Sequence, residues 1–403
     1  MSTIKLTGTS SGSSIIKAPD SGSTNQTFTL PAATGTLVDT STTNALTTRV
    51  NSVGGRKNII INGAMNIAQR GTSAADTGRK TMDRFTVSNA GNDEYPTQSQ
   101  HALTSSDTEV WAKGFRYSYH LTNGNQTDVG GADRVCFQYH MEAQDIATSG
   151  WDYTSSSSYI TLSFWCKSSV AQNFYGRLES VDGTSQGYAF ETGSLTANAW
   201  TKVTKTIAGN SNLTFDNNNG HGLSIEIVMF RGTDKTGTRP LNAWAAFDGA
   251  TRVPDMTSTW YTTNDATFEI TGVQLEVGST ATDFEHRSYG EELALCQRYF
   301  CKSGDPTTPY ASGSYHFYSI LAMHGTSNAY MPRILFPVSM RASPTVVSGS
   351  IQSYNGSIWQ TWNGSNSASK RTDGFTLGAA GGLSVTLGES RLSQTDWTAD
   401  AEI

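Results

Sequence analysis

The sequence is poor in charged residues and contains no run of one sign. Of its 403 residues only 15% are charged, and 28 basic against 34 acidic residues leave a net charge of −6. A protein that binds duplex nucleic acid needs clustered cations to displace counterions from the phosphates. We therefore expect no nucleic-acid partner. A glycan is uncharged or weakly charged and needs no such bias.

Cysteine is also scarce, and long apolar runs are missing. The four cysteines follow no zinc-ligand spacing, so we expect free, buried thiols in a protein that folds in a reducing cytosol. No stretch approaches the roughly 18 apolar residues of a membrane span, and no apolar core follows the opening residues as in a secretory signal. We expect a chain made and folded in a cytoplasm, without membrane insertion.

Glycine and alternating apolar residues are what the sequence has in quantity. Its 39 glycines and 10% aromatic residues favour strands joined by tight turns. Apolar and polar residues alternate over 160–166 and over 223–229, which predicts strands with one packed face. The alternation changes phase at Gly272, which predicts a β-bulge. Such strands, with no helical pattern between them, predict a jelly-roll β-sandwich over residues 57–288.

A helix is predicted at residues 289–300 and a second β domain after it. Ser288 and Glu291 have the spacing of a capping box. Apolar residues recur on one helical face at Tyr289, Leu293, Cys296 and Phe300. Residues 301–403 return to strand patterns. The predicted fold class is all-β: an extended N-terminal attachment segment, a large jelly-roll β-sandwich, a short linking helix and a smaller C-terminal β domain.

Residues 1–48 have a different composition, rich in Ser, Thr and Gly. Short apolar pieces such as 4–6 and 15–16 cannot form a core within one chain. Either the segment is disordered, or the pieces form short strands that bury against other copies or a particle. The strand period of residues 27–30 favours the second interpretation. One helical face, suited to a three-chain neck, carries Leu46, Val50 and Val53. We expect residues 1–56 to serve particle attachment and trimerisation.

Patterns for catalysis are missing. The seven histidines form no His-Glu-x-x-His pair, and there is no Gly-x-Ser-x-Gly elbow or phosphate loop. Asp and Glu are abundant, yet no spacing selects the facing carboxylates that glycoside hydrolysis needs. We expect no enzyme and no cofactor. A structural calcium at acidic turns such as Asp93-Glu94 or Asp248-Gly249 stays open, and the metal content is unknown.

The C-terminal domain carries the predicted glycan-binding site. Sugar rings stack on Trp and Tyr, and their hydroxyls pair with Asn, Asp and Gln. The stretch 353–366 has this composition. The alternative is that its tryptophans pack the core of the small domain. The candidate residues are Tyr354, Trp359, Trp362, Asn355, Gln360 and Asn363. We expect Trp165 and Trp200 to lie in the core of the sandwich.

Two stretches resemble bacteriophage tail-fibre-like proteins, especially those of marine and cyanobacterial phages. The first is Asn-Ile-Ile-Ile-Asn-Gly-Ala-Met-Asn-Ile-Ala-Gln-Arg-Gly at 58–71, followed by Asp-Arg-Phe at 83–85. The second begins Gln-Leu-Glu-Val-Gly at 274 and runs into Cys-Gln-Arg-Tyr-Phe at 296–300. The layout of residues 83–287 is also similar to carbohydrate-binding jelly rolls. The resemblance implies a trimeric virion appendage that attaches to host surface polysaccharide.

The resulting hypothesis is a non-enzymatic tail-fibre or spike protomer. It would be a homotrimer in the virion, assembled in the host bacterial cytoplasm, with residues 1–56 contacting other virion proteins. Residues 301–403 would form the receptor-binding tip that attaches the particle to a host cell-surface glycan. Two alternatives stay open: a head fibre or decoration protein without a ligand, and a polysaccharide-degrading tailspike enzyme. A secreted bacterial adhesin is disfavoured by the missing signal.

Overall fold

The computed structural model describes the sandwich continuously and the rest of the chain in part. The described residues are 4–7, 13–16, 57–305, 308, 316–319, 322–323, 328–330, 333–349, 351–354, 359–362, 369–376, 378–380 and 392–403. The predicted neck residues Leu46, Val50 and Val53 lie outside them. The chain divides into two compact units, Met1–Val53 and Gly54–Ile403. In the first, β1 (Ile4–Thr7) pairs antiparallel with β2 (Ser13–Ile16), which confirms strands for these two apolar pieces.

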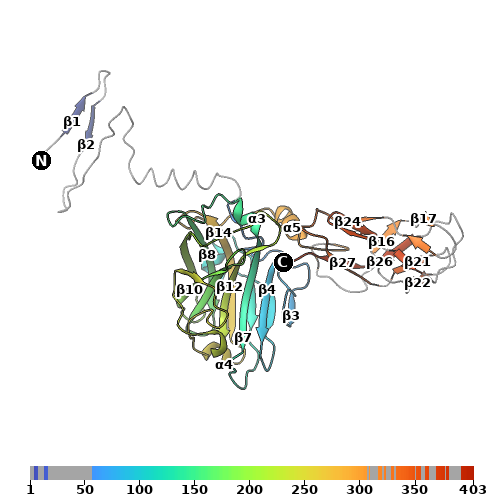
Figure 1. The fold of residues 1–403 in the computed structure, drawn as a ribbon, viewed down its shortest axis with the longest axis horizontal. Helices are drawn as coiled ribbons and strands as arrows, with labels where there is room; N and C mark the ends of the chain where they lie inside the picture. The colour runs from blue at the N-terminus through green and yellow to red at the C-terminus, as the bar shows by residue number, and fades with distance from the viewer. Residues whose placement is uncertain are drawn as a thin grey trace. The chain divides into compact units, whose positions relative to one another are not determined.

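Two six-stranded antiparallel sheets form a β-sandwich and confirm the predicted all-β class (Figure 1). Sheet I has the order β11-β8-β14-β6-β5-β3 and sheet II the order β13-β10-β9-β12-β7-β4. The chain passes repeatedly from one sheet to the other, as in a jelly roll. The strands of sheet I are β3 (Ser73–Ala75), β5 (Thr97–Ala102), β6 (Tyr117–Thr122), β8 (Tyr159–Ser168), β11 (Thr201–Ala208) and β14 (Thr267–Val277). Those of sheet II are β4 (Phe85–Ala90), β7 (Arg134–Glu142), β9 (Asn173–Ser180), β10 (Gln186–Ser194), β12 (His221–Arg231) and β13 (Trp244–Ala246).

The core between the sheets is built by the alternation that the sequence predicts. One large cluster of buried apolar side chains includes the inward residues of β8 and β12: Ile160, Leu162, Phe164, Cys166, Leu223, Ile225, Ile227 and Met229. Each such side chain stabilises the fold by about 1.5–3 kcal/mol. Short helices lie in the connections: α2 (Thr108–Trp111), α3 (Ala143–Ala147), η1 (Thr233–Lys235) and α4 (Thr259–Thr262).

The predicted bulge at Gly272 is confirmed. The register between β14 and β8 shifts between Thr271 and Gln274. Gly272 has a φ of +64°, where glycine carries no steric penalty. A Cβ at this position would lie 2.6 Å from the ring of Phe115. The glycine therefore both turns the strand and lets Phe115 pack on the outer face of sheet I, the face turned away from sheet II.

The linking helix begins where the sequence predicts and ends earlier. In α5 (Tyr289–Gln297) the hydroxyl of Ser288 accepts a hydrogen bond from the backbone N of Glu291 at 3.3 Å. The predicted end at residue 300 is wrong, because Phe300 begins β15 (Phe300–Lys302) and pairs with β27 (Trp397–Asp400). The predicted apolar face is also only partly right, since Tyr289 is 45% exposed while Cys296 is fully buried.

Short strands make up the C-terminal region. β27 is the central strand between β15 and β20 (Thr345–Ser348). The rings of Phe336, Phe375 and Trp397 lie 5.2–5.8 Å apart and form a small aromatic core. The remaining strands are β16 (His316–Ser319), β17 (Ala322–Met323), β18 (Asn328–Tyr330), β19 (Ile334–Leu335), β21 (Ile351–Tyr354), β22 (Trp359–Trp362), β23 (Ser369–Arg371), β24 (Gly374–Thr376), β25 (Gly378–Ala380) and β26 (Leu392–Thr395). The predicted domain boundaries within 57–403 stay predictions.

Two expectations about the whole chain can be compared with the described residues. The predicted free, buried thiols are confirmed at Cys136, Cys166, Cys296 and Cys301. Among the described residues, no helix has the length and apolar character to cross a membrane.

Candidate functional site

The predicted glycan-binding residues fall on the β21–β22 pair. Tyr354 stands directly opposite Trp359, and Gln360 and Trp362 follow on β22. Successive residues of a strand alternate between its faces, so position 359 shares a face with Tyr354 and position 362 does not. Asn355 and Asn363 lie outside the described residues. The six-residue site stays a prediction.

A pocket of about 350 Å³ lies on the outer face of sheet I. Its floor comes from β8, β11 and β14, and its walls come from the segment after α2 and from the loop after β14. We call it the Trp165 pocket. Its lining residues are Ala112, Lys113, Phe115, Ser163, Trp165, Lys202, Gly272, Thr282, Asp283, Phe284 and His286.

Aromatic rings form one wall of the Trp165 pocket. The ring of Phe115 packs edge-on against Phe284 at 5.0 Å and lies 5.2 Å from the ring of His286. Phe284 and His286 are 4.9 Å apart. Trp165 on the floor is only partly buried, so the prediction that it lies in the core is wrong. Its neighbours in β8 fill the core, and alternation turns Trp165 to the outer face.

Polar groups stand beside this aromatic wall. Lys202 is exposed and lies directly opposite Trp165 in the β11–β8 ladder. The amine of Lys113 lies 3.9 Å from a carboxylate oxygen of Asp283, and both side chains are exposed. Exposed charged groups of this kind stay hydrated, and the hydroxyl groups of a ligand can replace their bound water. The pocket therefore combines apolar ring surface with free hydrogen-bonding groups.

The Gln-Leu-Glu stretch of the resemblance fixes the loop that forms one wall. Glu276 accepts hydrogen bonds from the backbone N and the hydroxyl of Thr282 at 2.8 and 2.6 Å. Gln274 donates to Glu276 at 2.8 Å and accepts from the backbone N of Glu285 at 2.8 Å. Gln274 and Glu276 are both buried. Because the two side chains are buried and bind the loop at three points, the wall is held in place before any ligand arrives.

Trp200, unlike Trp165, is buried, but it packs in a cluster with Val110 and Phe115 and not in the core between the two sheets. It is 8% exposed, and its indole N–H donates to Asp107 at 3.0 Å. The amine of Lys167 lies 3.1 Å from Asp107 and 2.8 Å from Glu269. Burial alone would raise the pKa of Asp107, but the hydrogen bonds from Trp200, Thr104 and Lys167 lower it to about 2. Asp107 is therefore an ionised anchor under Trp200.

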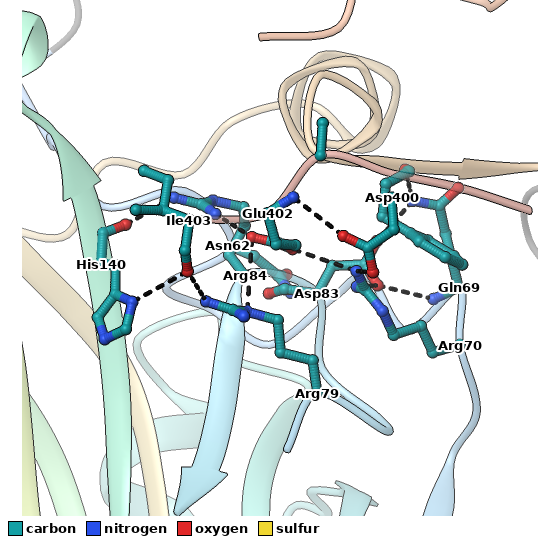
Figure 2. A network of polar contacts seen from close by, with 12 residues as sticks. Asn62, Gln69, Arg70, Arg79, Asp83, Arg84, His140, Asp400, Glu402 and Ile403 are labelled. Atoms are coloured by element: carbon teal, nitrogen blue, oxygen red, sulfur yellow. Dashed lines mark hydrogen bonds and ion pairs between the residues drawn. The ribbon is translucent and has the colours of Figure 1, made fainter. Parts of the chain in front are cut away.

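The first stretch of the resemblance binds residues near the C-terminus in a buried polar network (Figure 2). Glu402 lies among three guanidinium groups: it pairs with Arg84 and lies 3.4 Å from Arg70 and 3.6 Å from Arg79. Arg79 also donates to the backbone oxygen of Ile403 at 2.6 Å. The side chains of Arg84 and Glu402 are only 1% and 4% exposed. The network therefore joins the start of the sandwich to the residues that follow β27.

Asp83 lies in the same network. Its pKa is raised, as in a catalytic acid, but its carboxyl group is not accessible to a substrate. Burial raises its pKa to about 6, against the opposing effects of Arg70 and Gln69. A raised carboxyl pKa is common in general acids. However, Gln69 donates to one oxygen of Asp83 at 2.5 Å and Arg70 lies 3.4 Å from the other. Asp83 is fully buried, so we assign it a structural role.

The outer face of sheet II has a smaller cavity of about 220 Å³ whose charges are paired. Glu226 binds Arg177 at 2.8 Å and also pairs with Arg231. Burial alone would raise the pKa of Glu226, but the two guanidinium groups lower it below its usual range. Glu179 pairs with Arg177 as well. Glu226 is therefore not placed to donate a proton as a glycosidase acid must.

Two histidines at the same cavity stack on each other. The rings of His140 and His221 are 4.4 Å apart with an angle of 26° between them. Burial and the neighbouring His221 lower the pKa of His140 to about 4. The pair is therefore neutral at pH 7.

In the acidic turns considered for calcium, the carboxylates accept hydrogen bonds from nearby groups of the protein. Asp93 accepts from the backbone N and the hydroxyl of Thr127, both at 2.7 Å. Asp248 accepts from the backbone N of Ala250 at 2.8 Å. Within the part of the chain that the structure describes, one group of side chains has its potential ligand atoms within 4.8 Å of one another: His101, His120 and Glu269. No sequence pattern signals this group, because its members come from separate strands.

Comparison with known proteins gives only distant structural likenesses. No protein-family model and no curated protein matches the chain. The tailspike protein 4 enzymatically active domain of bacteriophage CBA120 matches 55% of this chain and 21% of its own at 12% identity, with a TM-score of 0.29. This chain thus spans about a fifth of that tailspike chain. The N-terminal cellulose-binding domain of Cellulomonas fimi β-1,4-glucanase C matches 53% of this chain and 98% of its own at 10% identity, with a TM-score of 0.26.

A third similar structure matches a larger share of this chain. The tandem CBM22-1–CBM22-2 domain of Paenibacillus barcinonensis Xyn10C matches 87% of this chain and 98% of its own at 9% identity, with a TM-score of 0.26. With TM-scores of 0.26 to 0.29, these likenesses carry no argument about fold or function. The functional argument therefore depends on the residues of this chain.

Proposed function

We propose that the protein binds a glycan in the Trp165 pocket and does so as a protomer of a bacteriophage tail fibre or spike. The observation that carries the binding proposal is the meeting of Trp165, Phe284 and the exposed side chains of Lys113, Lys202 and Asp283 in one concave site. A sugar offers the complement: an apolar ring face and a rim of hydroxyls.

The size of the pocket suits a short oligosaccharide segment. Its volume of about 350 Å³ is near the lower end of the roughly 300–1,000 Å³ usual for small-molecule sites. One stacked ring contributes on the order of 1 kcal/mol beyond its burial, so a single site binds weakly. Three copies on one fibre would multiply that contact through effective concentration. A homotrimer attached through residues 1–56 fits this requirement.

The place in a virion is supported by the resemblance of the stretches at 58–71 and 274–300 to tail-fibre-like proteins. The apolar pieces of the first 56 residues support the trimer, because one chain offers them little to pack against. Sedimentation of the full chain tests this part. A trimer is expected at micromolar concentration, and a monomer would contradict it.

The residues that line the Trp165 pocket favour binding of a glycan without its cleavage. Of the described residues that line the Trp165 pocket, Asp283 alone is a carboxylate, and glycoside hydrolysis needs two. We therefore propose a non-enzymatic attachment protein. Incubation with host polysaccharide should release no new reducing ends, and their release would revive the tailspike-enzyme alternative.

Two tryptophan variants test which site binds. Trp165→Ala should weaken retention of the full chain on host polysaccharide about tenfold, equivalent to about 1.4 kcal/mol, because it removes the floor of the pocket. Trp359→Ala, in the site predicted from sequence, should leave retention within twofold of the unmodified protein. Thermal unfolding of both variants controls for loss of fold. The reverse pattern would move the site to β21–β22, and no retention of the unmodified protein would favour a fibre without a ligand.

A further inference from the structure

Three potential metal ligands meet on the outer face of sheet I, and none of them lines the Trp165 pocket. In the sheet ladders Glu269 of β14 stands opposite His120 of β6, and His120 stands opposite Ser99 of β5. His101 is two residues beyond Ser99 and so lies on the same face as His120. A nitrogen of each histidine and a carboxylate oxygen of Glu269 all lie within 4.8 Å of one another.

The spacing of two of these groups is that of ligands around one ion. Nδ1 of His120 lies 3.6 Å from Oε1 of Glu269, which is longer than a hydrogen bond. This nitrogen is buried and has no hydrogen-bond partner. In a tetrahedral zinc site with bonds of about 2.0–2.1 Å, neighbouring ligand atoms are about 3.4 Å apart. An ion can therefore sit between His120 and Glu269 with little movement of either side chain.

Neighbouring hydroxyls hold the partly buried His120 and the buried Glu269 in orientation. Nε2 of His120 lies 3.2 Å from the hydroxyl of Thr122. When Nε2 donates its proton to Thr122, the lone pair of the imidazole is on Nδ1, the atom that faces Glu269. Ser118 donates to the other oxygen of Glu269 at 2.6 Å. Outer contacts of this kind orient the ligands of metal sites and tune their affinity.

His101 supplies the third ligand from the solvent side. Its side chain is exposed, and its ring lies 5.0 Å from the ring of His120. An exposed ring can rotate to bring either nitrogen to the ion. Three protein ligands leave a fourth position open to water or to another ligand.

Lys167 opposes an ion at this place. Its amine lies 2.8 Å from the same oxygen of Glu269 that faces His120. It also lies 3.1 Å from Asp107, so it can keep one carboxylate partner while Glu269 binds the metal. Lys167 is expected to weaken metal binding by charge repulsion without preventing it.

We propose that His101, His120 and Glu269 bind a divalent transition-metal ion, Zn²⁺ foremost. Two imidazoles and one carboxylate are the donor set of several catalytic zinc sites. Imidazole nitrogen favours zinc, cobalt, nickel and copper over the oxygen-seeking Ca²⁺ and Mg²⁺. The ion joins β5, β6 and β14 across three neighbouring strands.

The first test is zinc binding by the full chain after treatment with a chelator. Titration with ZnCl₂ followed by calorimetry should give one ion per chain, and CaCl₂ should give none. CoCl₂ should produce the visible absorption of a tetrahedral cobalt centre. Absence of stoichiometric zinc binding by the unmodified protein would overturn the proposal.

Three variants assign the ion to these residues. His101→Ala and Glu269→Gln should each weaken zinc binding at least tenfold. Lys167→Gln should strengthen it several-fold, an effect that a merely structural role of Lys167 does not produce. His286→Ala, which changes an exposed histidine outside the group, is the control and should bind zinc as tightly as the unmodified protein.

His101→Ala keeps the test decisive even if Glu269→Gln, which changes a buried residue, fails to fold. His101 is at the surface, so His101→Ala should unfold at the temperature of the unmodified protein. Zinc affinity and cobalt absorption unchanged in His101→Ala would overturn the three-ligand site.

Discussion

The Trp165 pocket on sheet I and the cavity on the outer face of sheet II use polar residues in opposite ways. On sheet II, Glu226 is enclosed between Arg177 and Arg231, and all three side chains are at most 6% exposed. On sheet I, Lys113 and Asp283 are 58% and 89% exposed beside an aromatic wall. A charge paired in a dry environment stabilises one conformation. A charge kept in water beside apolar rings stays available to a ligand, which is why we assign binding to sheet I.

The largest expected effect is a loss of stability when Glu226 on the outer face of sheet II is replaced. Glu226→Ala would leave buried Arg231 without its carboxylate partner and Arg177 with Glu179 alone, and breaking such a buried pair costs about 3–5 kcal/mol. The free energy of unfolding, measured with denaturant at pH 7, should fall by that amount. A loss below about 1 kcal/mol would show that the face is hydrated, and the contrast with sheet I would then disappear.

The next effect connects the fold to the binding face. Gly272→Ala places a Cβ against Phe115 at a positive φ, so it should destabilise by about 3 kcal/mol and also weaken glycan retention. Gly278 has a φ of +129°, and a Cβ added there would meet no atom within 4 Å. Gly278→Ala is the control: it should lose stability without affecting glycan retention. Equal glycan retention by both variants would show that the bulge at Gly272 does not support the Trp165 pocket.

A smaller effect is the pH dependence of stability that His140 on sheet II contributes. The pKa of His140 is lowered to about 4 in the folded protein, against about 6.5 in an unfolded chain. The unfolded state therefore binds more protons between these values. The stability contribution is complete above pH 6.5 and is lost as the pH falls toward 4, by at most about 1.4 kcal/mol per pH unit.

The measurement is the free energy of unfolding of the unmodified protein and of His140→Gln at several pH values from 7 to 4.5. The difference between the two should change with pH in the window from 6.5 down to 4. A constant difference would mean that His140 is solvated in the folded protein.

The smallest expected change in stability is on the open face. Asp283 is 89% exposed and 3.9 Å from its partner amine, so Asp283→Asn should change the free energy of unfolding by less than about 0.5 kcal/mol. Glycan retention should nevertheless decrease, because an acceptor at the rim of the pocket is altered. A large loss of stability would show that Asp283, like Glu226, holds the fold together.

Local patterns predicted most of the sandwich and little of the site. Alternation at 160–166 predicted a core strand, and the phase change at Gly272 predicted the bulge, because both depend on neighbours in sequence. The end of α5 could not be predicted, since Phe300 is drawn into a strand by β27, about a hundred residues later. Long-range pairing decided that boundary.

The binding face required the same distant information. Alternation turns Trp165 outward, but whether that face is bare or covered depends on the segments around Phe115 and Phe284, which are far from Trp165 in sequence. The group of His101, His120 and Glu269 depends on the register of three strands. The tail-fibre resemblance identified Gln274 and Glu276 as a motif, and the structure explains them as supports for a pocket wall.

Hydrogen exchange of the full chain with and without a fragment of host polysaccharide tests the central claim most directly. Binding in the Trp165 pocket predicts slower exchange at residues 111–116 and 282–286, with no change on the paired face of sheet II. Protection confined to β21 and β22 would contradict the assignment and restore the site expected from sequence alone.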